Sequence, residues 1–281
     1  WFLYLAYNAP HFPLHAPPEE IAKYKDRYHG GWDKLRAARL VRMKKLGIVP
    51  EHTQLSKRSH WRNYGETKIG VNPAWETLPE DRRLDLARRM AIYAAMIDRL
   101  DQQLGRVIAD LKATGAYANT LIIFTSDHGE QIGDHWLIGK MGYFDASYHI
   151  PLIIRDPDAT NTRGLQVKAF TENVDIMPTM LVWLDLDIPH QCDGKSLISI
   201  LRSGEIPDYW RDAAHWELDF RDVEAGETLE QSLGLTQHQC SLNVLRDDRY
   251  KYVHFTNLPP LFFDLQRDPN EFVNQANNPD Y

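Results

Sequence analysis

A continuous apolar run at residues 120–125 (TLIIFT) most constrains the fold, because it directly follows a long amphipathic segment. In residues 79–114, apolar side chains recur at steps of three and four, which predicts one long helix, and Gly115 is a natural stop for it. An apolar run without polar alternation is typical of a parallel strand that is covered on both faces. A helix followed by such a strand predicts an α/β layer.

Further strand and helix signals lie on both sides of this unit. Residues 1–7 (WFLYLAY) read as a buried strand that is already under way, and they are followed by a proline-containing loop. Residues 19–63 show helical spacing, whereas residues 64–78 predict a loop. The remaining signals are a strand at 151–155 (PLIIR) and a helix at 175–186 with Pro178 in its first turn.

The pattern of apolar residues changes after about residue 205. Beyond it, short strand-like runs occur without a long helix between them, at 213–218, 242–245, 250–255 and 261–265. We therefore expect an α/β domain over residues 1–205 and a small antiparallel subdomain over residues 206–281.

Composition excludes several classes of protein. The 281 residues are 43% hydrophobic and 25% charged, which is typical of a folded globular chain. A net charge of −7 argues against a broad nucleic-acid or anionic-membrane surface, and no run approaches the roughly 18 apolar residues of a membrane-spanning helix. The two cysteines, Cys192 and Cys240, lack the spacing of a zinc site and are expected to be reduced thiols, which favours a cytoplasmic location.

Candidate metal ligands directly follow the apolar run. Asp127 and His128 would lie just beyond the carboxyl end of a strand, where ligands bind in open α/β sheets. A carboxylate and an imidazole suit a divalent cation, and Gly129 allows a close approach of backbone or ligand. The alternative is a structural turn with a solvated histidine.

Two cationic or titratable side chains are candidates for binding an anion. Lys140 lies between glycines (GKMG), where it can reach an anion, although an ordinary solvated lysine is the alternative. His11 lies between Pro10 and Pro13, which limit the conformational freedom of its backbone. An imidazole held in place in this way suits proton transfer or anion binding.

Other chemistries lack their motifs. The chain has no Gly-x-Ser-x-Gly elbow for a serine hydrolase, and Ser126 is expected to be a hydrogen-bonding partner rather than a nucleophile. Neither a Gly-x-Gly-x-x-Gly loop nor a Walker-type loop is present for nucleotide phosphates. A phosphotransferase with two metal ions would need additional His or Asp ligands, and no convincing set is apparent.

Taken together, the motifs resemble the sulfatase family of the alkaline phosphatase superfamily, and within it the phosphonate monoester hydrolases and arylsulfatases. The resemblance extends along almost the whole chain, and its motifs occur in the family's order. They are NAPHFP at 8–13, TSDHGEQIGDH at 125–135, VDIMPT at 174–179, DGKSL at 193–197 and DLQRDPNE at 264–271.

This resemblance implies an alkaline-phosphatase-like three-layer α/β sandwich whose N-terminal strands are missing, with a small C-terminal antiparallel α+β subdomain. It implies one divalent cation, Ca²⁺ or Mn²⁺, held by Asp127 and His128. His11 and Lys140 would bind the substrate oxygens and act in catalysis, with His11 protonating the leaving oxygen. The substrate would be a small anionic ester, without nucleic acid or membrane, and a homo-oligomer is possible.

The family's nucleophile motif is absent. Sulfatases carry Cys/Ser-x-Pro-x-Arg, with the Cys converted to formylglycine, and neither Cys192 nor Cys240 fits it. The resemblance therefore implies a C-terminal fragment of a hydrolase of sulfate esters, phosphonate monoesters or phosphodiesters, inactive alone because its nucleophile lies upstream. The alternative is a non-catalytic metal- or anion-binding pseudo-enzyme.

Overall fold

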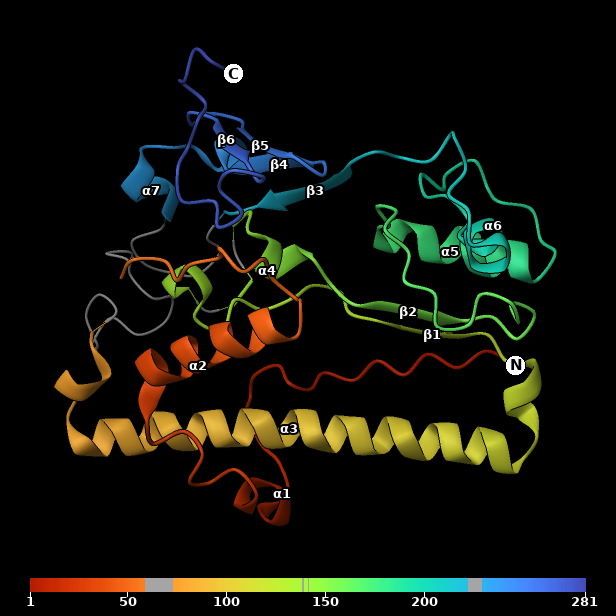
Figure 1. Cartoon of the computed structure of the whole chain (residues 1–281), viewed down its shortest axis with the longest axis horizontal. Coiled ribbons are helices and arrows are strands. Elements are labelled where there is room, and N and C mark those ends of the chain that lie inside the picture. Colours follow the sequence, from red (N-terminus) through yellow and green to blue (C-terminus); the bar gives the residue numbers. More distant parts are fainter. Residues whose placement is uncertain (59–72, 138, 141, 222–228) are drawn as a thin grey trace. The chain divides into compact units, whose positions relative to one another are not determined.

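The computed structural model describes residues 1–58, 73–137, 139–140, 142–221 and 229–281 (Figure 1). These residues form two compact units, Trp1–Thr120 and Leu121–Tyr281, and each is described by itself. Most of the loop that the sequence predicts over residues 64–78 lies outside the described residues.

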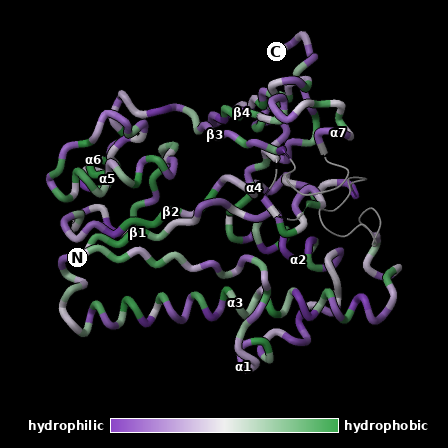
Figure 2. The backbone as a smooth tube through the Cα atoms, turned by 180° about the vertical axis from the view of Figure 1, so that it is seen from behind, coloured by the Kyte–Doolittle hydropathy of each residue, from purple (hydrophilic) through white to green (hydrophobic). Residues whose placement is uncertain are grey.

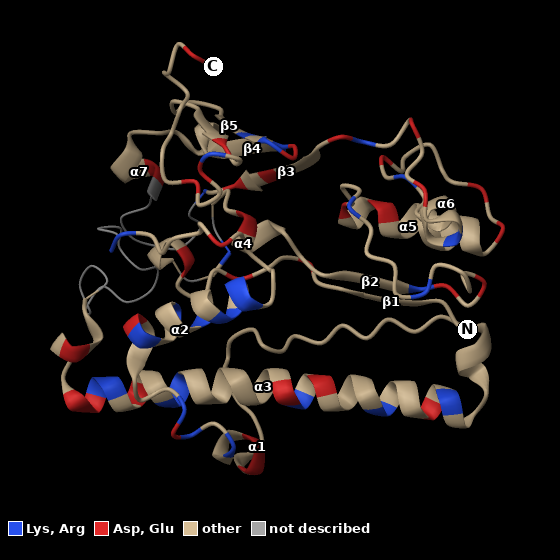
Figure 3. Ribbon diagram, viewed as in Figure 1, with Lys and Arg blue, Asp and Glu red and all other residues tan. Residues whose placement is uncertain are grey.

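The first unit is built on one long helix, α3 (Glu80–Ala113), which confirms the helix predicted over residues 79–114. Gly115 ends it with a φ of 77°, a left-handed conformation that glycine adopts without strain. The fully buried side chains of α3 are mostly alanines, so a neighbouring segment can approach its backbone closely. Figure 3 shows acidic and basic residues interspersed along the helix, as expected for its solvent-facing side.

Short elements pack along α3. The helix α1 (Pro18–Ala22) is tied to it by Lys23, whose Nζ lies 2.9 Å from Asp98 Oδ2. The helix α2 (Gly31–Lys45) confirms the helical spacing predicted within residues 19–63. Trp32 of α2 meets buried Trp75 edge-on, with ring centroids 5.0 Å apart. Trp75 begins the 3₁₀ turn η1 (Trp75–Thr77), and a second turn, η2 (Ala116–Asn119), follows α3.

The strand predicted at residues 1–7 is not formed. These residues are extended without strand pairing, and Trp1 and Phe2 are 82% and 76% exposed. An isolated extended segment becomes a strand only when a neighbour pairs with its N–H and C=O groups. No segment of the first unit's described residues provides that pairing, so the prediction from apolar composition is wrong for this structure.

The second unit begins with a two-stranded sheet. Strand β1 (Ile122–Thr125) confirms the strand at 120–125, and β2 (Leu152–Arg155) confirms the one at 151–155. The two pair antiparallel, with Phe124 opposite Ile153, so the prediction of a parallel strand covered on both faces is wrong here. Figure 2 shows both as apolar segments, yet Ile153 is 65% exposed. Apolar composition indicates a surface to be covered, but the direction of pairing depends on which strand lies alongside.

Helices and turns follow this sheet. The turn η3 (Asp134–Trp136) and the helix α4 (Asp145–Tyr148) lie between β1 and β2 in sequence. After β2 come η4 (Asn173–Asp175), α5 (Ile176–Trp183) and α6 (Ile198–Ser203), and α5 confirms the helix predicted over residues 175–186. Asp175 is buried and stabilises this region, because it accepts hydrogen bonds from Arg211 and from the Lys195 backbone N–H, the latter at 2.8 Å.

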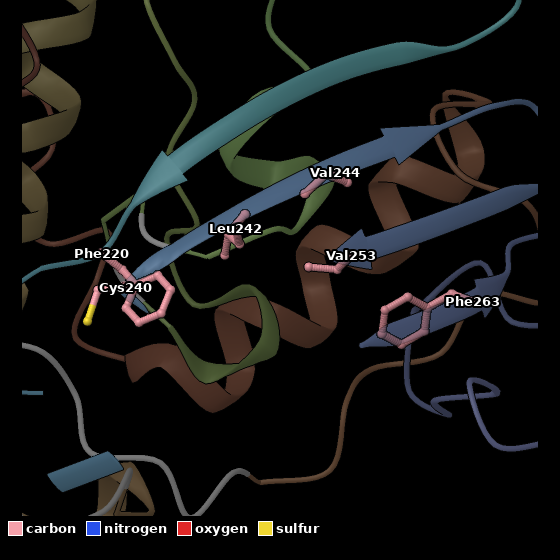
Figure 4. Close-up of a cluster of buried hydrophobic side chains, with 6 residues drawn as sticks. All are labelled: Phe220, Cys240, Leu242, Val244, Val253 and Phe263. Atoms are coloured by element: carbon pink, nitrogen blue, oxygen red, sulfur yellow. The ribbon is translucent and has the colours of Figure 1, made fainter. Parts of the chain in front are cut away.

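The predicted antiparallel C-terminal sheet is confirmed. Its strands are β3 (Ala214–Asp219), β4 (Ser241–Arg246), β5 (Tyr250–Phe255) and β6 (Leu261–Asp264), and each pairs antiparallel with the next. Buried and exposed residues alternate along β4 and β5, as one covered face requires. Figure 4 shows the core on that face: Phe220, Cys240, Leu242, Val244, Val253 and Phe263. The short helices α7 (Leu229–Leu233) and η5 (Gln237–Gln239) precede β4.

The structure bears on the expectations for the cysteines and for membrane-spanning helices. Both cysteines are free thiols, as predicted, and burial raises the pKa of the Cys240 thiol. Among the described residues, no helix is long and apolar enough to cross a membrane. The division into domains at residue 205 stays a prediction.

Candidate metal and anion site

The loop after β1 is fixed by side-chain hydrogen bonds. Thr125 Oγ1 donates to the Pro151 carbonyl at 3.0 Å, and Asn173 Nδ2 donates to the Ser126 carbonyl at 2.9 Å. Ser126 Oγ donates to the His128 carbonyl at 2.5 Å, which is the hydrogen-bonding role that the sequence predicts for this serine. Three hydrogen bonds therefore stabilise the backbone that carries Asp127 and His128.

Asp127 and His128 lie side by side at this strand end. The His128 backbone N–H donates to Asp127 Oδ1 at 2.9 Å, which is the local turn contact considered as the structural alternative. The other oxygen, Oδ2, lies 3.3 Å from His128 Nε2, and the Asp127 side chain is 82% exposed against 28% for His128. A carboxylate oxygen and a ring nitrogen thus converge at the surface of the loop.

The second ring nitrogen determines the protonation of His128. Nδ1 lies 2.8 Å from the Gly129 carbonyl oxygen, which can only accept a hydrogen bond, so Nδ1 carries the proton. In the neutral ring, Nε2 then carries the lone pair that can bind a cation, and this atom lies 3.3 Å from Asp127 Oδ2. Orientation of a ligating histidine by such a backbone contact is typical of metal sites. The donor set fits a divalent cation.

Charge around Asp127 favours its ionised form. Partial burial opposes ionisation, but the hydrogen bond from the His128 backbone and the nearby His128 and Lys140 side chains hold the pKa of Asp127 below its usual range. Lys140 is half-buried in the loop that continues from this strand end, and its charge contributes to the lowered pKa of Asp127. The structure therefore brings Asp127, His128 and Lys140 into one region.

The site is incomplete within the described parts of the chain. These residues contain no group of three or more His, Cys, Asp or Glu side chains that would hold a metal ion. His11 belongs to the first unit, where its ring Nδ1 lies 2.7 Å from the Phe12 carbonyl oxygen. The catalytic and substrate-binding roles of His11 and Lys140 and the metal-ligand roles of Asp127 and His128 stay predictions.

Sequence reasoning missed a buried ion cluster in the second unit. Lys251 of β5 is fully buried, and its Nζ lies 2.5 Å from Asp145 Oδ1 and 2.7 Å from Glu271 Oε1. Burial tends to raise the pKa of Asp145, but the charge and hydrogen bond of Lys251 hold it below its usual range. Burial raises the pKa of Glu271 to about 7. The charge of Lys251 opposes this rise in part, and repulsion from Asp145 adds to it. A lysine in a strand gives no sign that it is buried until its partners are known.

The raised pKa of Glu271 predicts a pH dependence of stability. Its ordinary value is 4.5 and its folded value about 7, so between these values the native state binds more protons than the unfolded state. The contribution of Glu271 to the free energy of unfolding is fully present below pH 4.5, and it falls by roughly 3 kcal/mol as pH rises to 7.

Urea unfolding of the wild type and Glu271→Gln at pH 5 and pH 7.5 measures this loss. Because glutamine does not titrate, the variant gains stability relative to the wild type at the higher pH. A difference in the free energy of unfolding between the two proteins that is the same at both pH values would contradict the assignment.

Comparison with known protein families identifies the chain. The model of the family described as "Sulfatase" matches residues 1–186, and the one described as "N-sulphoglucosamine sulphohydrolase, C-terminal" matches residues 133–281. The chain belongs to the sulfatase family. The Asp127–His128 strand end and Lys140 lie within the first match.

Individual relatives agree with this assignment. Over 283 residues, the sulfatase chain is 42% identical to the multifunctional alkaline phosphatase superfamily protein PehA of Trinickia caryophylli, covering 100% of this chain and 52% of PehA. It is 32% identical over 204 residues to arylsulfatase K of Gallus gallus, covering 70% of this chain and 35% of the relative. The chain thus spans about half, or less, of the length of these relatives.

A solved structure supports the fold class. The phosphonate monoester hydrolase of Agrobacterium radiobacter superposes with a TM-score of 0.65 at 51% identity, covering 71% of this chain and 39% of that one. The sulfatase-type α/β fold with a C-terminal antiparallel sheet, expected from the resemblance, is confirmed.

Proposed function

We propose that the protein carrying this chain is a metal-dependent hydrolase of sulfate esters, phosphonate monoesters or phosphodiesters. The observation that carries the proposal is the convergence of Asp127 Oδ2 and His128 Nε2, 3.3 Å apart, where the charge of Lys140 also lowers the pKa of Asp127. Relatives named as arylsulfatase and phosphonate monoester hydrolase support the substrate class.

Each residue is assigned a distinct task. Asp127 and His128 hold one divalent cation, Ca²⁺ or Mn²⁺, which when bound supplies a Lewis acid for the reacting oxygens. Lys140 neutralises the non-bridging oxygens of the sulfuryl or phosphoryl group. His11 donates a proton to the leaving oxygen. The nucleophile, a formylglycine or a serine, is assigned to sequence outside these residues, because the motif Cys/Ser-x-Pro-x-Arg does not occur among them.

One observation favours a second candidate, a non-catalytic metal- or anion-binding protein of the same fold. The motif Cys/Ser-x-Pro-x-Arg does not occur in the 281 residues. The sequence that precedes residue 1 in the gene separates the two candidates. An intact Cys/Ser-x-Pro-x-Arg motif supports the enzyme, and an otherwise complete N-terminal half without it supports the binding protein.

The direct test is hydrolysis by the full-length protein before and after removal of its metal. We expect turnover of at least one substrate among an aryl sulfate, a phenylphosphonate monoester and a phosphodiester. Chelation should abolish this turnover, and Mn²⁺ or Ca²⁺ should restore it. Turnover that persists in the metal-free protein would overturn the proposal.

A further inference from the structure

The buried Lys251 satisfies its ammonium group entirely with neighbouring protein atoms. In addition to Asp145 and Glu271, at 2.5 and 2.7 Å, its Nζ donates to the Tyr143 carbonyl at 3.3 Å. Three acceptors use the three protons of the ammonium group. Burying a lysine in this way requires all of its partners to remain in place, so the cluster fixes the segments that supply them.

Those partners come from segments that are distant in sequence. Asp145 is the first residue of α4, and Tyr143 lies just before it. Glu271 belongs to the segment after β6, whereas Lys251 is in β5. The ion cluster therefore fastens residues 143–145 to the C-terminal sheet.

The helix α4 also contacts the candidate metal site. The Gly129 N–H donates to the Ser147 carbonyl at 2.8 Å, and a Cβ on Gly129 would lie 2.3 Å from the Ala146 oxygen. The Gly129 carbonyl oxygen in turn accepts a hydrogen bond from the His128 Nδ1–H, at 2.8 Å. A continuous series of contacts thus leads from Lys251, through α4 and Gly129, to the imidazole.

The loop that carries Lys140 is anchored at the same place. Near its start, the N–H of buried Gln131 donates to the Gly139 carbonyl at 2.8 Å. At its end, the Tyr143 carbonyl accepts from Lys251. Because Lys140 precedes Tyr143 by three residues in sequence, displacement of residues 143–145 would shift the end of the Lys140 loop as well as the support of His128.

We propose that Lys251 is a positioning residue, which holds α4 and the Lys140 loop so that His128 and Lys140 face the metal and the anion together. The identity of that metal and that anion rests on the proposed function. The contacts by which Lys251 holds residues 143–145, here called the tether, do not rest on it. Loss of an outer contact that orients a metal ligand typically lowers metal affinity by 10- to 100-fold.

The test compares Lys251→Met with Asp264→Asn in the full-length protein. Asp264 is a matched control, because it is also a buried charged residue of this sheet, but it is bonded to Tyr281 and Arg249. The readouts are hydrogen exchange of peptides covering residues 128–148 and 241–246, and Mn²⁺ affinity by calorimetry. For Lys251→Met we expect faster exchange confined to 128–148 and a 10- to 100-fold weaker Mn²⁺ affinity, while Asp264→Asn leaves both as in the wild type.

Two results would overturn the positioning role. One is exchange over residues 128–148 and Mn²⁺ affinity that both stay at wild-type levels in Lys251→Met. The other is an equal change in both peptides and in both variants, which would indicate a general structural role.

A milder variant keeps the test decisive if Lys251→Met does not fold. Asp145→Asn retains the side-chain size and removes one charge, so it should increase exchange over 128–148 to a smaller degree. Unchanged exchange in that variant would overturn the tether.

If the wild type binds no Mn²⁺, the proposed function fails, and the exchange measurement still decides whether the tether exists.

Discussion

Replacing Asp127 with Asn in the full-length protein is expected to lower kcat/KM for its ester substrate about a thousandfold, with loss of the bound metal. Asparagine has nearly the same volume and can still accept the hydrogen bond that the His128 backbone donates to Oδ1 at 2.9 Å. It lacks the negative charge that a divalent cation requires of Oδ2. The local fold should therefore persist while the metal is lost.

Metal content and turnover, measured on the same preparation, check this prediction. Asp187→Asn is a suitable control, because it makes the same chemical change at an exposed position beyond α5. The control should keep the metal and the activity of the wild type. A fully metal-loaded and active Asp127→Asn protein would show that Asp127 is not a metal ligand.

Gly129→Ala is the second change with a large expected effect. The added Cβ would lie 2.3 Å from the Ala146 carbonyl oxygen, which belongs to the backbone and cannot rotate away. Either α4 or the loop after His128 must move, which breaks the 2.8 Å hydrogen bond from Gly129 to Ser147. We expect the free energy of unfolding to fall by about 3 kcal/mol, at the upper end of the usual cost of overpacking, and the Mn²⁺ affinity to fall with it.

Gly105→Ala is the matched control for this substitution. Gly105 lies within α3, and an added Cβ would meet no atom within 4 Å other than the adjoining backbone of the helix itself. Alanine there should raise stability by about 0.5–1 kcal/mol, because it is the better helix former. Urea unfolding measures both variants, and an unfolding midpoint for Gly129→Ala equal to that of the wild type would contradict the steric argument.

Local patterns predicted the helix α3 and the C-terminal sheet, because periodicity and turn residues act within a few positions. The strand expected at residues 1–7 and the parallel direction expected for β1 depend on which segment lies alongside. That information is absent from an apolar run itself. An apolar segment such as β2, with Ile153 at 65% exposure, indicates a surface to be covered but does not identify its partner.

The candidate site shows the same limit. Asp127 and His128 are predictable because they directly follow a strand, and Lys140 because it lies between glycines, where it can reach an anion. Lys251 was missed as a supporting residue, since its partners lie 106 and 20 residues away and no local spacing relates them. Side chains that act directly on a ligand often leave a sequence motif, whereas those that hold them in place are identified from the fold.

The most direct test of the metal assignment is a crystal structure of the full-length protein loaded with Mn²⁺, with anomalous diffraction recorded at the manganese edge. The structure predicts one strong anomalous peak within bonding distance of both Asp127 Oδ2 and His128 Nε2, the two atoms that lie 3.3 Å apart here. An anomalous peak bound by other residues, with Asp127 and His128 left free, would contradict the assignment.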